Sequence, residues 1–196
     1  MINNQVLDSL VKILKKNKVR CGIGGSFLLQ LYNLYDDPQD IDFWVYPDDL
    51  SIVKEIFCDY PQIEEKLQLP EEYHLKICYE GVFVDFVACF IVQPNKNKYQ
   101  YNLCPESIEW IDLDNGVEIP CTSLEDWYIV YKLLNRNNKA DIIKSYLESK
   151  NRIESDTYIK LNRALKDDNN KLPQKMKKDI RAFEQERRQI TIYDCI

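Results

Sequence analysis

The sequence predicts an α/β protein of the α+β type, in which a mixed β-sheet flanked by helices is followed by a helical C-terminal region. Over residues 1–122, apolar runs of strand length alternate with helical segments and are separated by glycine, proline and polar turns. From Ser123 onward, the apolar residues follow helical spacing instead. Of the 196 residues, 45% are hydrophobic and 30% are charged, which allows one sizeable core. We therefore expect a core of residues 1–122, with a helical region of residues 123–196 packed on it.

The first half of the core is predicted to alternate helices and strands. Its apolar residues recur at helical spacing in some segments and form short continuous runs in others. Pro38 and Pro47 end the second helix and the second strand, because proline disfavours helix before it and lacks a backbone donor. The expected order is helix, strand, helix, strand and helix, over residues 4–18, 19–23, 27–35, 41–46 and 49–58.

Two hairpins are predicted in the second half of the core. Glu80-Gly81 and Asp114-Asn115-Gly116 are turn sequences, and each lies between two apolar runs. The strands expected on either side cover residues 73–79 and 82–91 in the first hairpin, and 108–113 and 117–119 in the second.

Helices are predicted throughout the C-terminal region. Ser123 can cap the first of them, with Asp126 three residues later in the position that Glu or Gln usually takes. The expected helices cover residues 124–135, 139–149, 153–167 and 174–188. The last helix has a thin apolar stripe that buries little surface, so we expect it to dock loosely or to meet a partner chain in an oligomer.

Composition excludes several classes of protein. The seven cysteines are scattered, odd in number and without a C-x-x-C pair, which favours reduced thiols in a cytoplasmic protein over a disulfide framework or a zinc site. A single histidine excludes most zinc hydrolase designs. No apolar run is long enough to span a membrane, and the first residues lack the features of a secretory signal. We therefore expect a cytoplasmic protein without membrane contact.

Charge is distributed unevenly along the chain. Residues 1–149 carry a net charge of −10, which disfavours non-specific binding to nucleic acid. Residues 150–188 carry +5, which leaves open a phosphate-bearing partner such as tRNA, although a solvated helical face explains the same charges.

Three carboxylates are predicted to lie close together. Asp40 and Asp42 alternate with apolar residues at the start of a strand, so their side chains share one face. Asp85 has three apolar neighbours on each side in a predicted central strand, where an unpaired carboxylate would cost several kcal/mol. Magnesium or manganese would neutralise such a cluster, and two metals so held serve phosphoryl transfer. The alternatives are an exposed strand face for the first two acids and a salt bridge to lysine or arginine for Asp85.

Gly24-Gly25-Ser26 lies between a predicted strand and a predicted helix. Glycines let backbone amides approach a phosphate, and the start of a helix favours an anion. The P-loop and G-x-G-x-x-G patterns are absent, and a plain tight turn is the alternative.

In this order, the motifs resemble the polymerase-β-like nucleotidyltransferase superfamily. Its signature is Gly-Ser, then acid-apolar-acid-apolar, then a later apolar-acid-apolar strand, which Gly25-Ser26, Asp40 to Phe43 and Val84-Asp85-Phe86 match. The stretch from Leu124-Glu125-Asp126 to Arg136 is similar to a helix of bacterial minimal nucleotidyltransferases, which include antibiotic-modifying enzymes and abortive-infection-type toxins. Of the two acids in the toxin-type pattern that follows, only Asp141 is present. The resemblance implies a nucleotidyltransferase fold.

The resemblance also implies a role for each motif residue. Asp40, Asp42 and Asp85 would be the catalytic and metal-binding residues, with Mg²⁺ or Mn²⁺ as cofactor, and Asp85 would accept the proton of the acceptor hydroxyl. The nucleoside triphosphate (NTP) would be bound by Gly25, Ser26, Lys132 and Arg136. A lysine whose charged end reaches solvent is the alternative for Lys132, and we expect His74 to be structural or exposed rather than a base.

The activity implied is transfer of a nucleoside monophosphate from an NTP, such as ATP, to a hydroxyl group with release of pyrophosphate. The acidic body and the short chain favour a small-molecule acceptor over tRNA or protein. Two alternatives stay open: a non-catalytic nucleotide- or partner-binding member of the same fold, and a toxin-type enzyme that modifies tRNA or protein.

Overall fold

The computed structural model describes residues 4–63, 73–92, 99–103, 107–113, 116–149, 174–175 and 177–182. The chain forms two compact units. One comprises residues 1–91 with 100–123, and the other comprises residues 92–99 with 124–196. Each unit is described by itself.

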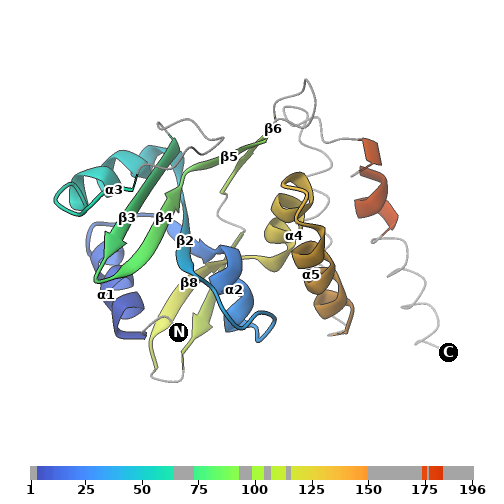
Figure 1. Ribbon diagram of the computed structural model, residues 1–196, viewed down its shortest axis with the longest axis horizontal. Helices are drawn as coiled ribbons and strands as arrows, with labels where there is room; N and C mark the ends of the chain where they lie inside the picture. The colour runs from blue at the N-terminus through green and yellow to red at the C-terminus, as the bar shows by residue number, and fades with distance from the viewer. Residues whose placement is uncertain are drawn as a thin grey trace. The chain divides into compact units, whose positions relative to one another are not determined.

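A mixed six-stranded sheet forms the centre of the first unit (Figure 1). The strand order across the sheet is β3-β4-β2-β1-β8-β7. Strand β2 is parallel to β4, and β1 is parallel to β8, whereas the pairs β1–β2, β3–β4 and β7–β8 are antiparallel. The strands are β1 (Cys21–Gly24), β2 (Asp40–Val45), β3 (His74–Tyr79), β4 (Val82–Val87), β7 (Ile108–Asp112) and β8 (Glu118–Thr122). The α+β prediction is therefore confirmed.

The segment predicted as one strand over residues 82–91 is two strands. Strand β4 ends at Val87, and β5 (Cys89–Val92) pairs with β6 (Tyr99–Asn102) in a separate two-stranded sheet. Between them, the amide of Ala88 donates to the carbonyl of Tyr73 at 2.9 Å, and the chain bends there. An uninterrupted apolar run gave no signal for this bend.

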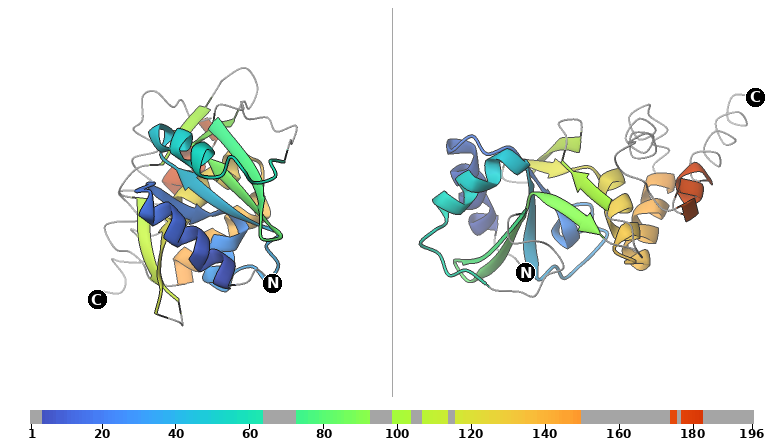
Figure 2. Two further views of the ribbon diagram at one scale, coloured as in Figure 1. Left: turned by 90° about the vertical axis from the view of Figure 1, so that its left-hand side faces the viewer. Right: turned by 90° about the horizontal axis from the view of Figure 1, so that it is seen from above.

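Helix α1 (Asn4–Lys16) and helix α3 (Leu50–Ile56) lie together on one side of the sheet (Figure 2). A short 3-10 helix, η1 (Pro47–Asp49), leads into α3. Phe57, directly after α3, stacks on Phe86 with ring centroids 5.2 Å apart, and Phe86 stacks on Phe43 at 5.5 Å. This side of the sheet therefore holds an aromatic core.

Helix α2 (Gly25–Leu31) starts two residues earlier and ends four residues earlier than the predicted helix over 27–35. Asn33 has a φ of 57°, and the amides of Asn33 and Leu34 donate to the carbonyls of Gln30 and Leu29. These two bonds form a Schellman motif, which satisfies the last carbonyls of the helix. Asparagine tolerates the left-handed conformation, so the helix ends well before Pro38.

In the second unit, α4 (Leu124–Leu133) and α5 (Asn137–Ser149) pack against each other. Nine of the ten residues of α4 are buried, and Lys132 is the exception. Described residues 174–175 and 177–182 are helical, whereas the helix predicted over 153–167 lies outside the described residues. The packing of residues 123–196 on the core stays a prediction.

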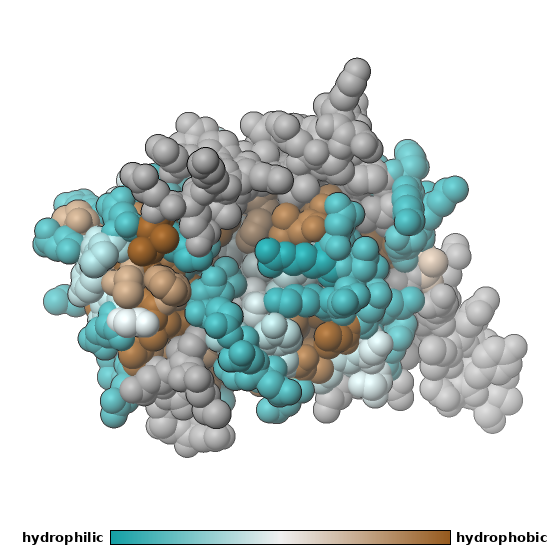
Figure 3. Space-filling view, in the orientation of Figure 1, coloured by the Kyte–Doolittle hydropathy of each residue, from teal (hydrophilic) through white to brown (hydrophobic). Residues whose placement is uncertain are grey.

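Among the described residues, no helix is long and apolar enough to cross a membrane. The five described cysteines are free, and Cys21, Cys89 and Cys121 are buried. A cytoplasmic location stays a prediction. On the face shown in Figure 3, polar side chains predominate and apolar ones form small patches.

Candidate active site

Asp40, Asp42 and Asp85 come together on one face of the sheet. The parallel register of β2 and β4 sets Asp42 beside Asp85 and Asp40 beside Phe83. One carboxylate oxygen from each of the three acids lies within 4.8 Å of the other two. The neighbouring residues Ile41 and Phe43 are fully buried on the opposite face, as strand alternation requires.

Gly25 allows the Asp42 side chain to occupy its position. In the register of β1 and β2, Asp42 pairs with Gly24, so its side chain lies at the start of α2. A Cβ atom on Gly25 would fall 1.6 Å from Asp42 Oδ2 and 2.5 Å from Asp42 Cγ. Gly25 also has a φ of +63°, a conformation that residues with a side chain rarely adopt. The glycine–serine turn and the two-acid strand are therefore parts of one local structure, and Ser26 follows as the second residue of α2.

Two residues of β3 contact the carboxylates, and sequence reasoning missed both contacts. His74 Nε2 hydrogen-bonds Asp85 Oδ1, and the two side chains are only 10% and 12% exposed. Lys76 Nζ lies 3.5 Å from Asp40 Oδ2, and the lysine side chain is also only 10% exposed. The expectation was that His74 is structural or exposed rather than a base, and its largely buried contact with Asp85 fits the structural role.

A signal for these contacts was available in the predicted hairpin. A two-residue turn at Glu80-Gly81 pairs Tyr79 with Val82, and the same antiparallel register then pairs Lys76 with Asp85. Paired residues of neighbouring strands share a face. The cations of β3 could therefore have been placed on the carboxylate face from the sequence.

The cluster gathers three acids at one point of the sheet. The ion pairs described at the cluster are those of Lys76 with Asp40 and of His74 with Asp85. Closely spaced carboxylate oxygens are the ligands that Mg²⁺ and Mn²⁺ prefer. Among the residues that the structure describes, this is the one group of three acidic, histidine or cysteine side chains with such spacing. The donor set therefore fits a hard divalent metal.

Comparisons of the sequence with known proteins gave no match to any family model or to any curated protein. Solved structures do match. A Thermotoga maritima protein assigned as a nucleotidyltransferase is 21% identical with a TM-score of 0.54, over 76% of this chain and 96% of that one. The lincosamide antibiotic adenylyltransferase LnuA, bound to lincomycin, is 14% identical with a TM-score of 0.53, over 74% of this chain and 98% of that one.

A third match is ANT(2")-Ia in complex with adenylyl-2"-tobramycin, which is 12% identical with a TM-score of 0.50, over 82% of this chain and 99% of that one. This chain has the nucleotidyltransferase fold. That result confirms the fold that the order of the three motifs implied.

In this nucleotidyltransferase fold, Lys132 and Arg136 belong to the second unit. Lys132 Nζ donates to Asp141 Oδ1 at 3.0 Å and to Asn137 Oδ1 at 3.4 Å, so its charge is held between α4 and α5. The lysine side chain is 17% exposed. Its partner Asp141 is 62% exposed, so the ammonium group of Lys132 lies in an ion pair at the surface of the α4–α5 pair.

Helix α4 is two residues shorter than the predicted helix over 124–135, and Arg136 does not lie on the helix that carries Lys132. Helix α4 ends at Leu133, and Asn135 has a φ of 57°. The amides of Asn135 and Arg136 donate to the carbonyls of Lys132 and Tyr131, which is again a Schellman motif. Arg136 is thus an exposed residue of the turn between α4 and α5.

Proposed function

We propose that this protein is a metal-dependent nucleotidyltransferase that moves a nucleoside monophosphate from an NTP to a hydroxyl group of an acceptor. The observation that carries the proposal is the cluster of Asp40, Asp42 and Asp85, whose ligating oxygens lie within 4.8 Å of one another. Its position beside the glycine–serine turn, in a fold shared with adenylyltransferases, supports the same activity.

Asp40, Asp42 and Asp85 would hold Mg²⁺ or Mn²⁺. When bound, such an ion supplies positive charge that offsets the charge of the triphosphate and acidifies the acceptor hydroxyl. His74 and Lys76 would keep their contacts to Asp85 and Asp40 and so hold two of the ligands in place. Phosphate oxygens would accept hydrogen bonds from the backbone at Gly25 and Ser26.

In the proposed reaction the acceptor oxygen bonds to the α-phosphorus, and the bond from that phosphorus to the bridging oxygen of the β-phosphate breaks. Asp85 accepts the proton of the hydroxyl group, and pyrophosphate leaves with the electron pair of the broken bond. We assign Lys132 and Arg136 to binding the charge of the triphosphate and of the departing pyrophosphate. Lys132 would have to share its ammonium group with Asp141, its partner in this structure.

The acceptor is proposed to be a small molecule with a hydroxyl group. LnuA binds lincomycin and ANT(2")-Ia binds an adenylylated tobramycin, so two proteins of this fold accommodate small polyhydroxylated molecules. The net negative charge of residues 1–149 supports the same choice over tRNA.

A thermal-shift assay with ATP, GTP, CTP and UTP, each with and without Mg²⁺, tests the binding step. We expect at least one NTP to raise the melting temperature only when Mg²⁺ is present. Asp42→Asn should remove that shift, whereas Asp36→Asn, which changes an exposed acid of the loop before β2, should retain it. The proposal fails if no NTP gives a Mg²⁺-dependent shift.

Transfer is tested with α-³²P-labelled NTPs and three acceptor sets: a panel of aminoglycosides and lincosamides, total RNA, and protein extract. Label on a small molecule with release of pyrophosphate is the expected result. Label on RNA or protein would support the toxin-type alternative instead.

A second candidate is a nucleotide-binding protein without turnover. The observation that favours it is that Asp85 and Asp40 already have partners in His74 and Lys76, so the acids are partly neutralised without a metal. Stoichiometric binding of an NTP without release of pyrophosphate, under every acceptor, would support this candidate.

A further inference from the structure

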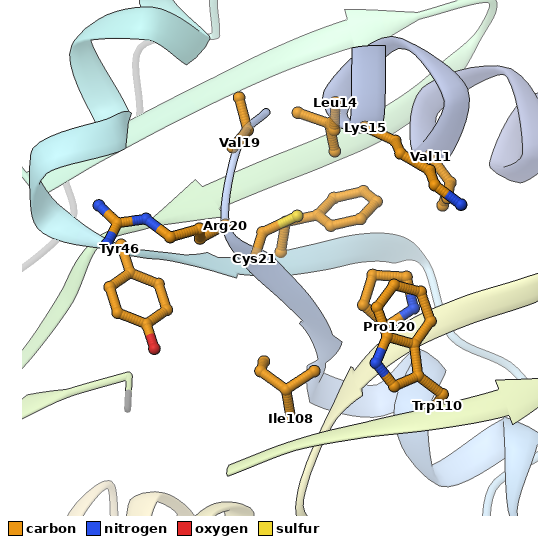
Figure 4. A pocket seen from close by; sticks show the side chains of 11 residues that line it. Val11, Leu14, Lys15, Val19, Arg20, Cys21, Tyr46, Ile108, Trp110 and Pro120 are labelled. Carbon is orange, nitrogen blue, oxygen red and sulfur yellow. The ribbon is translucent and has the colours of Figure 1, made fainter. Parts of the chain in front are cut away.

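A pocket of about 440 Å³ lies on the face of the sheet opposite the three carboxylates. Phe43 lines it, and Phe43 follows Asp42 in β2, so the two side chains point to opposite faces. Figure 4 shows Val11 and Leu14 of α1 on one side of the pocket, Ile108, Trp110 and Pro120 on the other, and Cys21 between them. All of these residues belong to the first unit.

The pocket wall is apolar and rich in aromatic rings. Phe43, Tyr46 and Trp110 line it, and Trp110 is 57% exposed on β7 at the edge of the sheet. Burial of an exposed indole ring against an apolar partner is favourable, because it removes apolar surface from water. A volume of about 440 Å³ is in the range of sites for small organic molecules. An aromatic occupant would cover the indole of Trp110 and fill the space.

Among the described residues that line the pocket, two are charged, and both are cations. Arg20 has its charge balanced, because its guanidinium donates to both oxygens of Asp49 at 2.8 and 2.9 Å and lies 4.4 Å from the ring centre of Tyr46. Lys15 has no ion-pair partner among the described residues, and no acidic side chain of those residues lines the pocket. The ammonium group of Lys15 is therefore available to one negative charge of an occupant.

Cys21 is the one cysteine among the described residues of the pocket wall. Burial, with a smaller contribution from the charge of Asp49, raises the pKa of its thiol to about 12. A thiol with a raised pKa is a weak nucleophile at neutral pH, so Cys21 contributes to the wall by packing.

We propose that this pocket binds a small aromatic monoanion, with its ring against Trp110 and its acidic group at Lys15. The proposal goes beyond the proposed transferase activity and does not depend on it, because none of the described residues that line the pocket belongs to the carboxylate cluster.

A pair of fluorescent probes tests the proposal on the full-length chain. 8-Anilinonaphthalene-1-sulfonate is an aromatic monoanion, and N-phenyl-1-naphthylamine has nearly the same shape without the charge. We expect saturable binding of the sulfonate at one site. Lys15→Glu should weaken the binding of the sulfonate about fivefold or more, since an attraction becomes a repulsion, and should leave the neutral probe unchanged.

Four further variants complete the test. Lys16→Glu makes the same change of charge on the neighbouring residue, which does not line the pocket, and should have little effect. Val11→Phe should reduce the binding of both probes because the larger side chain fills the pocket. If Val11→Phe lowers the helix content, Trp110→Ala replaces it, since removing this exposed indole should also weaken the binding of both probes.

Asp42→Asn should bind both probes as the wild-type protein does. This variant separates the outcome for the pocket from the outcome for the transferase proposal. Absence of saturable binding, or binding that is unchanged in Lys15→Glu and Trp110→Ala, overturns the proposal.

Discussion

The carboxylate of Asp42 lies against the backbone of Gly25. A Cβ atom on Gly25 would fall 1.6 Å from Asp42 Oδ2 and 3.0 Å from Asp42 Cβ, so a side chain at Gly25 and the observed position of the Asp42 carboxylate exclude each other. Two motifs fifteen to seventeen residues apart in the sequence are therefore coupled sterically. In the proposed enzyme, this contact places a metal ligand directly beside the phosphate-binding turn.

Gly25→Ala is therefore expected to move the Asp42 side chain and to lose the Mg²⁺-dependent thermal shift with NTP. The positive φ at Gly25 should by itself lower the free energy of unfolding by about 1–2 kcal/mol, measured by urea unfolding. Gly81→Ala is the matched control, because Gly81 has a φ of +81° but no atom within 4 Å of the added Cβ. That variant should lose a similar amount of stability and keep the shift. A Mg²⁺-dependent shift retained in Gly25→Ala would contradict this reading.

Lys76→Met should destabilise the protein when divalent metal is absent. The change leaves three neighbouring carboxylates with one cationic partner fewer, at an expected cost of about 1–3 kcal/mol in the free energy of unfolding. Mg²⁺ would then replace the positive charge of the Lys76 ammonium group, so it should stabilise this variant more than the wild-type protein. The measurement is urea unfolding at increasing Mg²⁺, with Lys16→Met as an exposed control. Equal Mg²⁺ dependence in all three proteins would count against a metal site.

His74→Ala is expected to weaken Mg²⁺ binding about tenfold without removing it. A carboxylate that binds a metal ion can only accept hydrogen bonds, so in the proposed site Nε2 of His74 would donate to Asp85 and orient it. His74→Gln keeps a donor and should recover part of the affinity, measured by calorimetry with Mg²⁺ alone. If His74→Gln binds no better than His74→Ala, the hydrogen bond does not position the ligand.

The ion pair of Arg20 and Asp49 predicts a dependence of stability on pH. The hydrogen bonds from Arg20 hold the pKa of the Asp49 carboxyl below its ordinary value of 3.8, despite the opposing effect of burial. A carboxyl with a lowered pKa stabilises the folded state above 3.8, and this stabilisation is lost as pH falls through the folded-state pKa.

Acid unfolding of Arg20→Met provides the measurement. The variant should be less stable than the unchanged protein at neutral pH, and the difference should shrink below pH 3.8 as Asp49 is protonated in both. A difference that stays constant down to the acid transition would show that Arg20 acts through its packing on Tyr46 instead.

Thiol labelling of the native protein should separate the cysteines. Burial raises the pKa of the Cys21 thiol to about 12 and raises the pKa of the Cys121 thiol still further, whereas Cys58 is exposed. Iodoacetamide followed by mass spectrometry should therefore modify Cys58 well before Cys21 or Cys121. In urea, all three should react at similar rates. Early labelling of Cys21 in the native protein would contradict its burial.

Local patterns in the sequence predicted most elements of the sheet and the helices around it. The turn at Glu80-Gly81 fixes the register of β3 and β4, because two residues close the hairpin and every pair follows from that closure. The ends of α2 and α4 were placed too late, at residues 35 and 135 instead of 31 and 133. Asn33 and Asn135 end these helices in the left-handed conformation, and an asparagine signals such an end only weakly.

The sequence by itself determined which side chains could form the candidate site. Strand alternation put Asp40 and Asp42 on one face, and the apolar neighbours of Asp85 made its carboxylate unusual. These inferences need only the chain within a few residues of each acid, because backbone geometry sets the direction of each side chain.

Only the tertiary structure decided what surrounds those acids. The parallel pairing of β2 with β4 joins segments separated by more than thirty residues, and the register that sets Asp42 beside Asp85 depends on packing across the whole sheet. The contacts of His74 and Lys76, the fit of Asp42 against Gly25 and the pocket behind Phe43 all follow from that register. Side-chain periodicity specifies which face of its own strand a residue occupies. Which strand pairs with which depends on burying both faces of the whole sheet, and that burial involves residues distant in the sequence.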